Sequence, residues 1–182
     1  MKILILSDIH GDIECAKKAI DAFHEEGAER MIILGDILYH GPRNDLPPHY
    51  APKEVIKLLN GYRDVITAIC GNCDAEVDAM VLDFAITPGF IHTEFDGIPV
   101  MLTHGHKHNT EHPEELKCGE ILLHGHTHVL TLEHFGNGNV YLNPGSVTLP
   151  KENNPKSYMI YSDGVFTVKD LNKNIIFEYK AK

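Results

Sequence analysis

The sequence predicts an α/β fold in which two packed sheets form a sandwich with helices on the outer faces. Helical and strand patterns alternate in the first half of the chain, and short strands separated by turn signals fill the second half. Polar residues that bind metals stand directly after several of the apolar runs. At 182 residues, the chain is expected to form a single domain over residues 1–182 with a core of its own.

In the first half, buried strands and amphipathic helices follow one another. Residues 2–7 are expected to form a strand covered on both faces, because Ile3–Leu6 is a continuous apolar run. Residues 12–26 carry apolar side chains at helical spacing. The pattern continues with a strand at Met31–Leu34, a Pro-rich ordered loop from Gly41 to Pro52, a helix at Lys53–Asn60, a strand at Val65–Cys70 and a short helix at Ala75–Leu82.

The second half is rich in predicted strands. Asp96-Gly97 and Asp163-Gly164 are strong signals for two-residue hairpin turns. The expected strands are Phe90–Phe95, Pro99–Thr103, Ile121–His124, Val129–Phe135, Val140–Asn143, Tyr158–Ser162, Val165–Asp170 and Ile175–Tyr179.

Composition narrows the classes of function. The chain has 16 basic and 26 acidic residues, and the net charge of −10 disfavours nucleic acids and anionic membranes as partners. No apolar run approaches the roughly 20 residues that span a bilayer. Four scattered cysteines give no secreted disulfide framework, and no signal peptide precedes the first strand, so we expect a cytoplasmic location.

Seven oxygen and nitrogen donors follow predicted strands. Since ligands in open α/β sheets bind at the carboxyl ends of strands, these donors are expected to meet at one edge. Each motif alone is weak evidence, but the ordered set indicates one site for two divalent ions, with Asp36 able to bridge them. Mn²⁺ is expected first, and Fe²⁺, Co²⁺, Ni²⁺ and Zn²⁺ also suit these donors. The donors are Asp8, His10, Asp36, Asn72, His104, His126 and His128.

This ordered set resembles the calcineurin-like metallophosphoesterase superfamily. The matching motifs are Asp8-Ile9-His10, Gly35-Asp36, Gly71-Asn72-Cys73-Asp74, His104 and Gly125-His126-Thr127-His128. The small YfcE-like phosphodiesterase subgroup is the most similar, on the compact length, the segment His40-Gly41-Pro42-Arg43-Asn44 and the turn Asn143-Pro144-Gly145-Ser146. We expect this last turn to be structural and to lie behind the metals. The family fold is a two-sheet α/β sandwich.

The resemblance implies a binuclear metal-dependent phosphodiesterase. Asp8, His10 and His128 would hold one ion, and Asn72, His104 and His126 the other. Asp36 would bridge them, while a metal-bound hydroxide attacks phosphorus in line. Asp74 matches the acidic residue of the family motif, so the expected catalytic residues are Asp36, Asn72, Cys73 and Asp74.

Cys73 stands where most of the family has a histidine that assists the phosphate or the leaving group. A thiol is a weak donor. We therefore expect reduced general-acid assistance and a preference for good leaving groups. Cys70 and Cys73 also form a C-x-x-C, and a redox role is the competing reading.

Other assignments stay open at this stage. His40, Arg43 and His106 are candidate substrate-binding residues, although Arg43 could equally stabilise its loop. The alternative functions are a phosphomonoesterase or protein phosphatase of the same fold and a non-catalytic, retromer-type protein-binding scaffold. A small phosphodiester is the expected substrate. Self-association to a dimer or tetramer through the Tyr39–Pro52 loop is possible, and the same loop could be a lid.

Overall fold

The computed structural model describes residues 1–181. Its α-helices are α1 (Ile13–Glu25) and α2 (Pro52–Asn60), and η1 (Asp78–Met80) is a single 3-10 turn. The strands are β1 (Lys2–Leu6), β2 (Arg30–Ile33), β3 (Ile66–Ile69), β4 (Ile86–Thr87), β5 (Phe90–Phe95), β6 (Ile98–Thr103), β7 (Ile121–Leu123), β8 (Leu130–Phe135), β9 (Asn139–Pro144), β10 (Ser157–Ser162), β11 (Val165–Asp170) and β12 (Ile175–Lys180).

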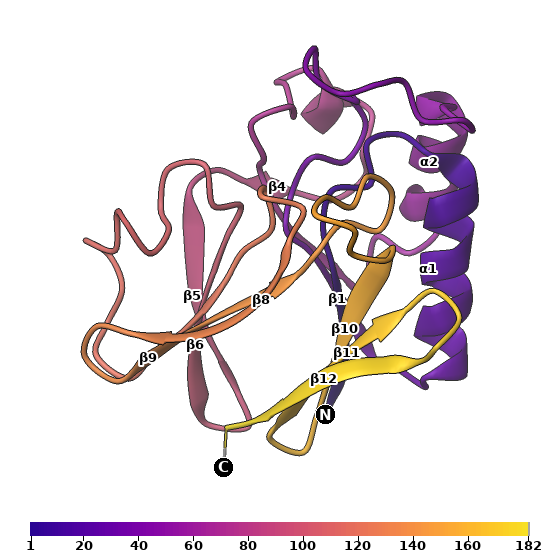
Figure 1. The fold of residues 1–182 in the computed structure, drawn as a ribbon. Helices are drawn as coiled ribbons and strands as arrows, with labels where there is room; N and C mark the ends of the chain where they lie inside the picture. Colours follow the sequence, from indigo (N-terminus) through magenta and orange to yellow (C-terminus); the bar gives the residue numbers. More distant parts are fainter. Residues whose placement is uncertain (182) are drawn as a thin grey trace.

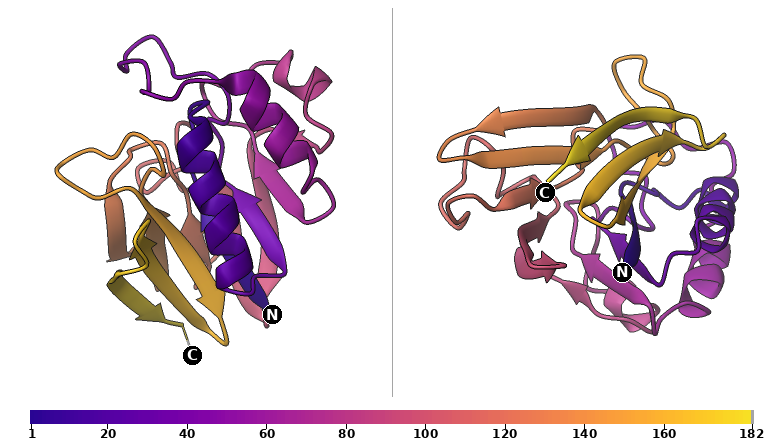
Figure 2. Two further views of the ribbon diagram at one scale, coloured as in Figure 1. Left: turned by 90° about the vertical axis from the view of Figure 1, so that its right-hand side faces the viewer. Right: turned by 90° about the horizontal axis from the view of Figure 1, so that it is seen from below.

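The elements form three layers (Figure 1). One sheet has seven strands in the order β12-β11-β10-β1-β2-β3-β4, and the other has five in the order β5-β6-β7-β9-β8. Both α-helices lie on the outer face of the seven-stranded sheet (Figure 2), and the second sheet packs on its inner face. The predicted α/β sandwich is confirmed. Within residues 1–181 no α-helix covers the outer face of the five-stranded sheet.

Strand β1 lies at the centre of the larger sheet and is buried on both faces. It pairs with β2 in parallel and with β10 in antiparallel register. Leu4 and Leu6 belong to the core beneath the helices, whereas Ile3 and Ile5 belong to the core between the sheets. This explains why Ile3–Leu6 is apolar without alternation.

Local chemistry sets the helix boundaries. The Asp12 side chain accepts a hydrogen bond from the Cys15 N–H at 2.9 Å, which caps the start of α1. Gly27, in a left-handed conformation at φ +65°, follows its end. Helix α2 begins at Pro52, where the missing N–H costs nothing. None of the helices in residues 1–181 combines the length and apolar composition needed to cross a bilayer.

Two details differ from the sequence prediction. The helix expected over Ala75–Leu82 is wrong, because only η1 forms there. The Asp78 carboxylate accepts from the Ala75 N–H at 2.8 Å, and such local bonds compete with helix formation. Strand β4, only two residues long, was missed. The hairpin turns at Asp96-Gly97 and Asp163-Gly164 are confirmed, since all four residues have φ between +50° and +82°.

A partly buried carboxylate, that of Glu26, joins the end of helix α1 to the C-terminal strands. The Glu26 carboxylate accepts hydrogen bonds from Lys169 Nζ at 2.7 Å and from Tyr158 Oη at 3.0 Å. Burial alone would raise the pKa of Glu26, but these two hydrogen bonds outweigh it and the pKa is lowered.

We predict that Glu26→Gln lowers the free energy of unfolding at pH 7 by about 1 kcal/mol, because charge-assisted hydrogen bonds are lost. Since the folded state lowers the pKa, the deficit is full above the usual pKa of 4.5 and shrinks as pH falls below it. Urea unfolding of both proteins at pH 7 and pH 3.5 tests this. A deficit of equal size at both pH values would contradict it.

Candidate metal centre

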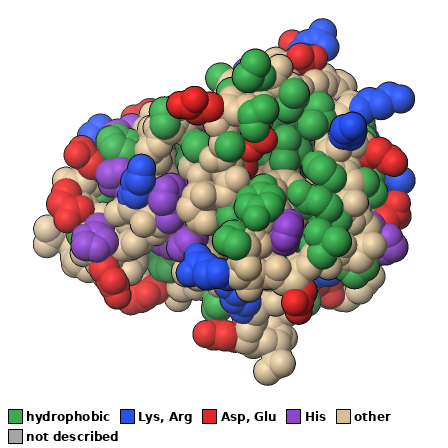
Figure 3. All heavy atoms as spheres, turned by 90° about the horizontal axis from the view of Figure 1, so that it is seen from above, with side chains coloured by type: hydrophobic (Ala, Val, Ile, Leu, Met, Phe, Trp, Pro, Cys, Tyr) green, Lys and Arg blue, Asp and Glu red, His purple; other side chains and the backbone are tan. Residues whose placement is uncertain are grey.

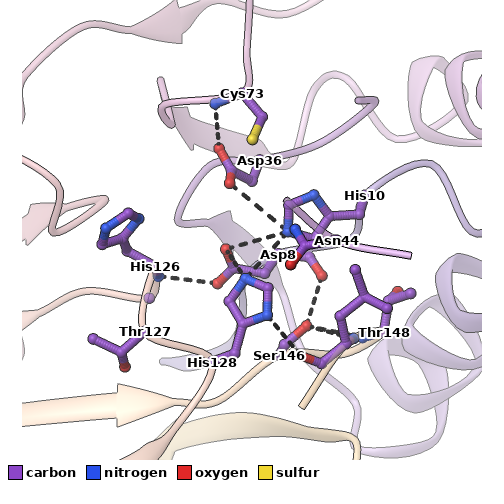
Figure 4. Close-up of polar contacts among 12 residues, drawn as sticks. Asp8, His10, Asp36, Asn44, Cys73, His126, Thr127, His128, Ser146 and Thr148 are labelled. Atoms are coloured by element: carbon purple, nitrogen blue, oxygen red, sulfur yellow. Dashed lines mark hydrogen bonds and ion pairs between the residues drawn. The ribbon is translucent and has the colours of Figure 1, made fainter. Parts of the chain in front are cut away.

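The predicted donors meet at the carboxyl ends of strands from both sheets. Strands β1, β2 and β3 are parallel, as are β6, β7 and β9, so the loops that follow them reach the same edge. Figure 4 shows the side chains of this edge pointing toward one another. Two of the possible ligand groups are Asp8 with His10 and His128, and Asp8 with Asp36 and His104.

The first group presents three lone pairs to one point. His10 Nδ1 donates to the Tyr39 carbonyl at 2.8 Å, and His128 Nδ1 donates to the Leu149 carbonyl at 2.6 Å. Each neutral ring therefore carries a lone pair on Nε2, and these two nitrogens face each other at 3.2 Å. Asp8 Oδ1, 3.2 Å from His128 Nε2, is buried without a hydrogen-bond partner. Only a cation or an added proton satisfies all three, so the donors fit a metal ion.

A second group forms around His104. Its Nδ1 donates to the Leu34 carbonyl at 2.7 Å, and its Nε2 faces Asn72 Oδ1 at 3.0 Å and Asp36 Oδ1 at 3.4 Å. The other oxygen of Asp36 lies 3.7 Å from His10 Nε2, so this carboxylate reaches both groups. The His126 ring is centred 5.0 Å from the His104 ring. The structure thus brings all seven predicted donors together.

The electrostatics of the centre favour positive charge. Burial alone would lower the pKa of His104, but the hydrogen bond to Asp36 and the charge of Asp8 raise it to about 9. Burial would raise the pKa of Asp36, yet His104 and the Cys73 N–H hold it far below its usual value. A buried site that stabilises two carboxylates and a protonated imidazole is also suited to bind divalent cations.

The backbone at the centre is unusual. Five donors have left-handed φ values between +49° and +64°: Asp8, His10, Asp36, His126 and His128. Such conformations cost about 1 kcal/mol or more per non-glycine residue. Two glycines allow close approach: a Cβ on Gly71 would collide with the Asp36 carboxylate, and one on Gly125 with Ser7 and Asp8. The surrounding structure therefore holds these donors against local strain.

Two polar residues hold the loops in place. The Asp74 carboxylate accepts from the backbone N–H groups of Asp36, Ile37 and Gly71 at 2.7–2.8 Å. Burial raises its pKa to about 6. Ser146 Oγ donates to the Asp8 carbonyl at 2.9 Å and accepts from the Leu149 N–H at 2.8 Å. Asp74 does not line the cavity at the centre, and the turn ending in Ser146 is structural, as predicted.

A cavity of about 330 Å³ opens above the centre. Cys73 lines it, and burial together with the Asp36 charge raises the pKa of the Cys73 thiol to about 12. Burial also raises the pKa of Cys70, so neither thiol has the low pKa of a redox centre. The full lining is Asp36, Gly41, Pro42, Arg43, Asn44, Asn72, Cys73, His126, Thr127, His128 and Lys151.

Of the three candidate substrate-binding residues, one lines the cavity above the centre and two do not. Arg43 lines this cavity, but the side chains of His40 and His106 do not. The His40 carbonyl accepts from Asn44 at 2.8 Å, and His106 lines a neighbouring cavity. Sequence reasoning missed Lys151, which also lines the cavity. Its backbone N–H donates to the His128 carbonyl at 3.0 Å. A single lysine in a turn carries no recognisable pattern.

The similarities to known proteins agree with this geometry. Residues 1–163 match the family described as the calcineurin-like phosphoesterase superfamily domain. The chain belongs to this superfamily. Phosphodiesterase YfcE of Escherichia coli K12 is 40% identical over 181 residues, covering 100% of this chain and 98% of the relative.

Two solved structures illustrate how similar the fold of this calcineurin-like phosphoesterase is to known folds. The structure of YfcE, a phosphoesterase from E. coli, superposes with a TM-score of 0.95 at 39% identity and covers 100% of both chains. Vacuolar protein sorting 29 from Cryptosporidium parvum superposes with a TM-score of 0.66 at 18% identity, covering 98% of this chain and 97% of that chain. The second similarity concerns the fold alone.

We predict that Asp74→Asn weakens divalent-metal binding about tenfold, as expected when a residue that orients ligands is replaced. The amide offers one acceptor oxygen where the carboxylate offers two, so the Asp36 and Gly71 loops lose part of their anchor. Calorimetric titration with Mn²⁺ measures the effect, and Asp83→Asn, at an exposed site, is the control. Equal affinity in both variants would show that Asp74 does not position the donors.

Proposed function

We propose that this phosphoesterase is a phosphodiesterase with two divalent metal ions, formed by one domain that spans the chain. The observation that carries the proposal is the arrangement of two groups of inward-facing ligand atoms with the Asp36 carboxylate between them. The 40% identity to a named phosphodiesterase over the full chain supports hydrolysis of phosphoric diesters.

In this proposal each donor has a defined place. Asp8, His10 and His128 hold one ion, Asn72, His104 and His126 hold the other, and Asp36 bridges them. When bound, two such ions supply Lewis acidity that lowers the pKa of water and offsets charge on the phosphate. Mn²⁺ is the ion we expect first, because carboxylate, amide and imidazole ligands suit it.

The residues of the cavity would bind and orient the substrate. Arg43 supplies a guanidinium that can hold two phosphate oxygens at once. Cys73 lies where proton donation to the leaving group would be needed, and a thiol with a pKa of about 12 is a poor acid. The reaction would therefore depend on leaving groups that depart without a proton.

The cation count favours diesters over monoesters. Arg43 and Lys151 are the only Lys or Arg side chains among the described residues that line the cavity. A diester carries one negative charge and a monoester close to two, so a site with few cations suits the diester.

The alternative of a protein-binding scaffold is less well supported. A scaffold has no need of a complete donor set, and all seven donors converge here.

The remaining expectations concern assembly and location. Several large hydrophobic side chains are exposed on the loop before α2 and around η1, and Figure 3 shows hydrophobic side chains gathered on this upper face. They are Tyr39, Leu46, Val77, Met80 and Val81. They fit the predicted self-association, which, like the cytoplasmic location, stays a prediction.

The decisive experiment removes and restores the metals. We predict that chelated protein has no activity toward bis(4-nitrophenyl) phosphate, that Mn²⁺ restores it, and that 4-nitrophenyl phosphate is hydrolysed more slowly. Asp36→Asn should lower kcat by about 100-fold or more, because the ions lose their shared carboxylate. Full activity in the chelated protein, or faster turnover of the monoester, would refute the proposal.

We predict that Cys73→Ala keeps kcat for bis(4-nitrophenyl) phosphate within about tenfold, since a true general acid would contribute about 10²–10⁴-fold. The thiol is too weak an acid to protonate the leaving group. Stopped-flow or plate-reader kinetics measure this, with metal content checked in both proteins. Complete loss of activity at unchanged metal content would assign Cys73 an essential chemical role.

A further inference from the structure

A second cavity of about 290 Å³ adjoins the metal centre. It shares two lining residues, His126 and Thr127, with the cavity above the donors, so the two spaces meet at these residues. His106, predicted to bind substrate, lines this second cavity. A substrate whose phosphate lies at the metals can therefore extend past Thr127 into it.

The two cavities differ in charge. Arg43 and Lys151 line the first, whereas no Lys or Arg is among the described residues that line the second. The second has one carboxylate in its lining, that of Glu111. An anionic group would be repelled there and would gain no cationic partner. The cavity therefore suits an uncharged group.

Aromatic rings form much of its lining. Tyr141 and His124 stack with ring centroids 4.1 Å apart and an angle of 19° between planes, and the rings of His106 and His126 lie 6.1 Å apart. Aromatic walls favour planar aromatic ligands through stacking and edge contacts.

Two histidines of this lining, His106 and His124, each have one buried ring nitrogen without a hydrogen-bond partner. His124 Nδ1 donates to the Gly125 carbonyl at 3.0 Å, which leaves Nε2 as an acceptor, and this buried atom has no hydrogen-bond partner. His106 Nδ1 also has none. A ring that carries N–H or O–H groups at its edge would complement such a wall.

Geometry also indicates which part of a diester would enter. Cys73, which by the family resemblance stands where a residue assists the phosphate or the leaving group, lines the first cavity and not the second. The leaving group would thus lie in the first cavity. The other ester group, which stays on the phosphate, is left to the second.

We propose that this second cavity binds the retained ester group of the substrate and selects a planar, uncharged aromatic group, such as an aryl ring or a nucleobase. The inference rests on the proposed phosphodiesterase function. It gives the cavity a use that a monoester cannot exploit, because a monoester has no retained group.

The test compares two diesters with the same leaving group. Bis(4-nitrophenyl) phosphate retains an aryl group, and methyl 4-nitrophenyl phosphate retains only a methyl group. Thr110, half-buried in the cavity lining, is changed to tryptophan to fill the space. Thr93→Trp is the matched control, since Thr93 is also half-buried but lines a separate cavity beside Met1.

We expect Thr110→Trp to raise KM for the bis-aryl diester at least about fivefold, the scale of one lost aromatic contact, with KM for the methyl diester changed less than about twofold. Thr93→Trp should change neither. Equal changes for both diesters, or no change for either, would overturn the inference. If Thr110→Trp lowers the melting temperature and loses both activities, Thr110→Leu is judged by the same criteria. Absence of turnover by the metal-loaded wild type would instead refute the phosphodiesterase function.

Discussion

The structure depends on one electrostatic constraint: buried carboxylates and imidazole nitrogens converge at one place in the fold. Asp8 and Asp36 are almost fully buried, and the Nε2 atoms of His10 and His128 face each other at 3.2 Å. Such an arrangement is unfavourable in a bare protein and becomes favourable only with cations. Much of the surrounding polar structure serves to hold it. The Asp74 carboxylate joins two loops, the Ser146 hydroxyl fixes the Asp8 backbone, and backbone carbonyls orient three imidazole rings.

Sequence reasoning found the donors because the physics behind them is simple. Parallel strands place their carboxyl ends at one edge, so Asp8, Asp36 and Asn72 had to meet, and the apolar runs before them marked the strands. It assigned Asp74 a catalytic role from the family motif, and the three backbone N–H groups that this carboxylate accepts from are visible only in the fold. The helix expected at Ala75–Leu82 failed for a related reason, since the Asp78 side chain bonds to the backbone in competition with a helix. Lys151 was missed because it lies in a turn whose position depends on a backbone hydrogen bond to the His128 carbonyl, and no sequence pattern marks that bond.

The same fold supports different uses, and the centre rather than the sandwich decides between them. The similarity to vacuolar protein sorting 29 at 18% identity shows that very different sequences adopt this fold. The features of the centre in this chain are local: seven donors, five of them held in left-handed conformations, and glycines at points where a Cβ would collide with a carboxylate. In the proposed function, Cys73 and the pair of cavities set which esters the centre suits, through weak acid assistance in the first cavity and an aromatic lining without Lys or Arg in the second.

The central position of β1 has a consequence for how the protein is made. This first strand pairs with β2 early in the chain, but its other edge is closed by β10, where Lys2 is opposite Ser162. Asp8 likewise contacts His128 and Ser146, which lie more than a hundred residues later in the chain. Contacts of such long range form late and slow folding. During synthesis, the N-terminal half emerges with an unpaired hydrophobic strand edge and half of a metal centre, so the growing chain must avoid aggregation until its last third has left the ribosome.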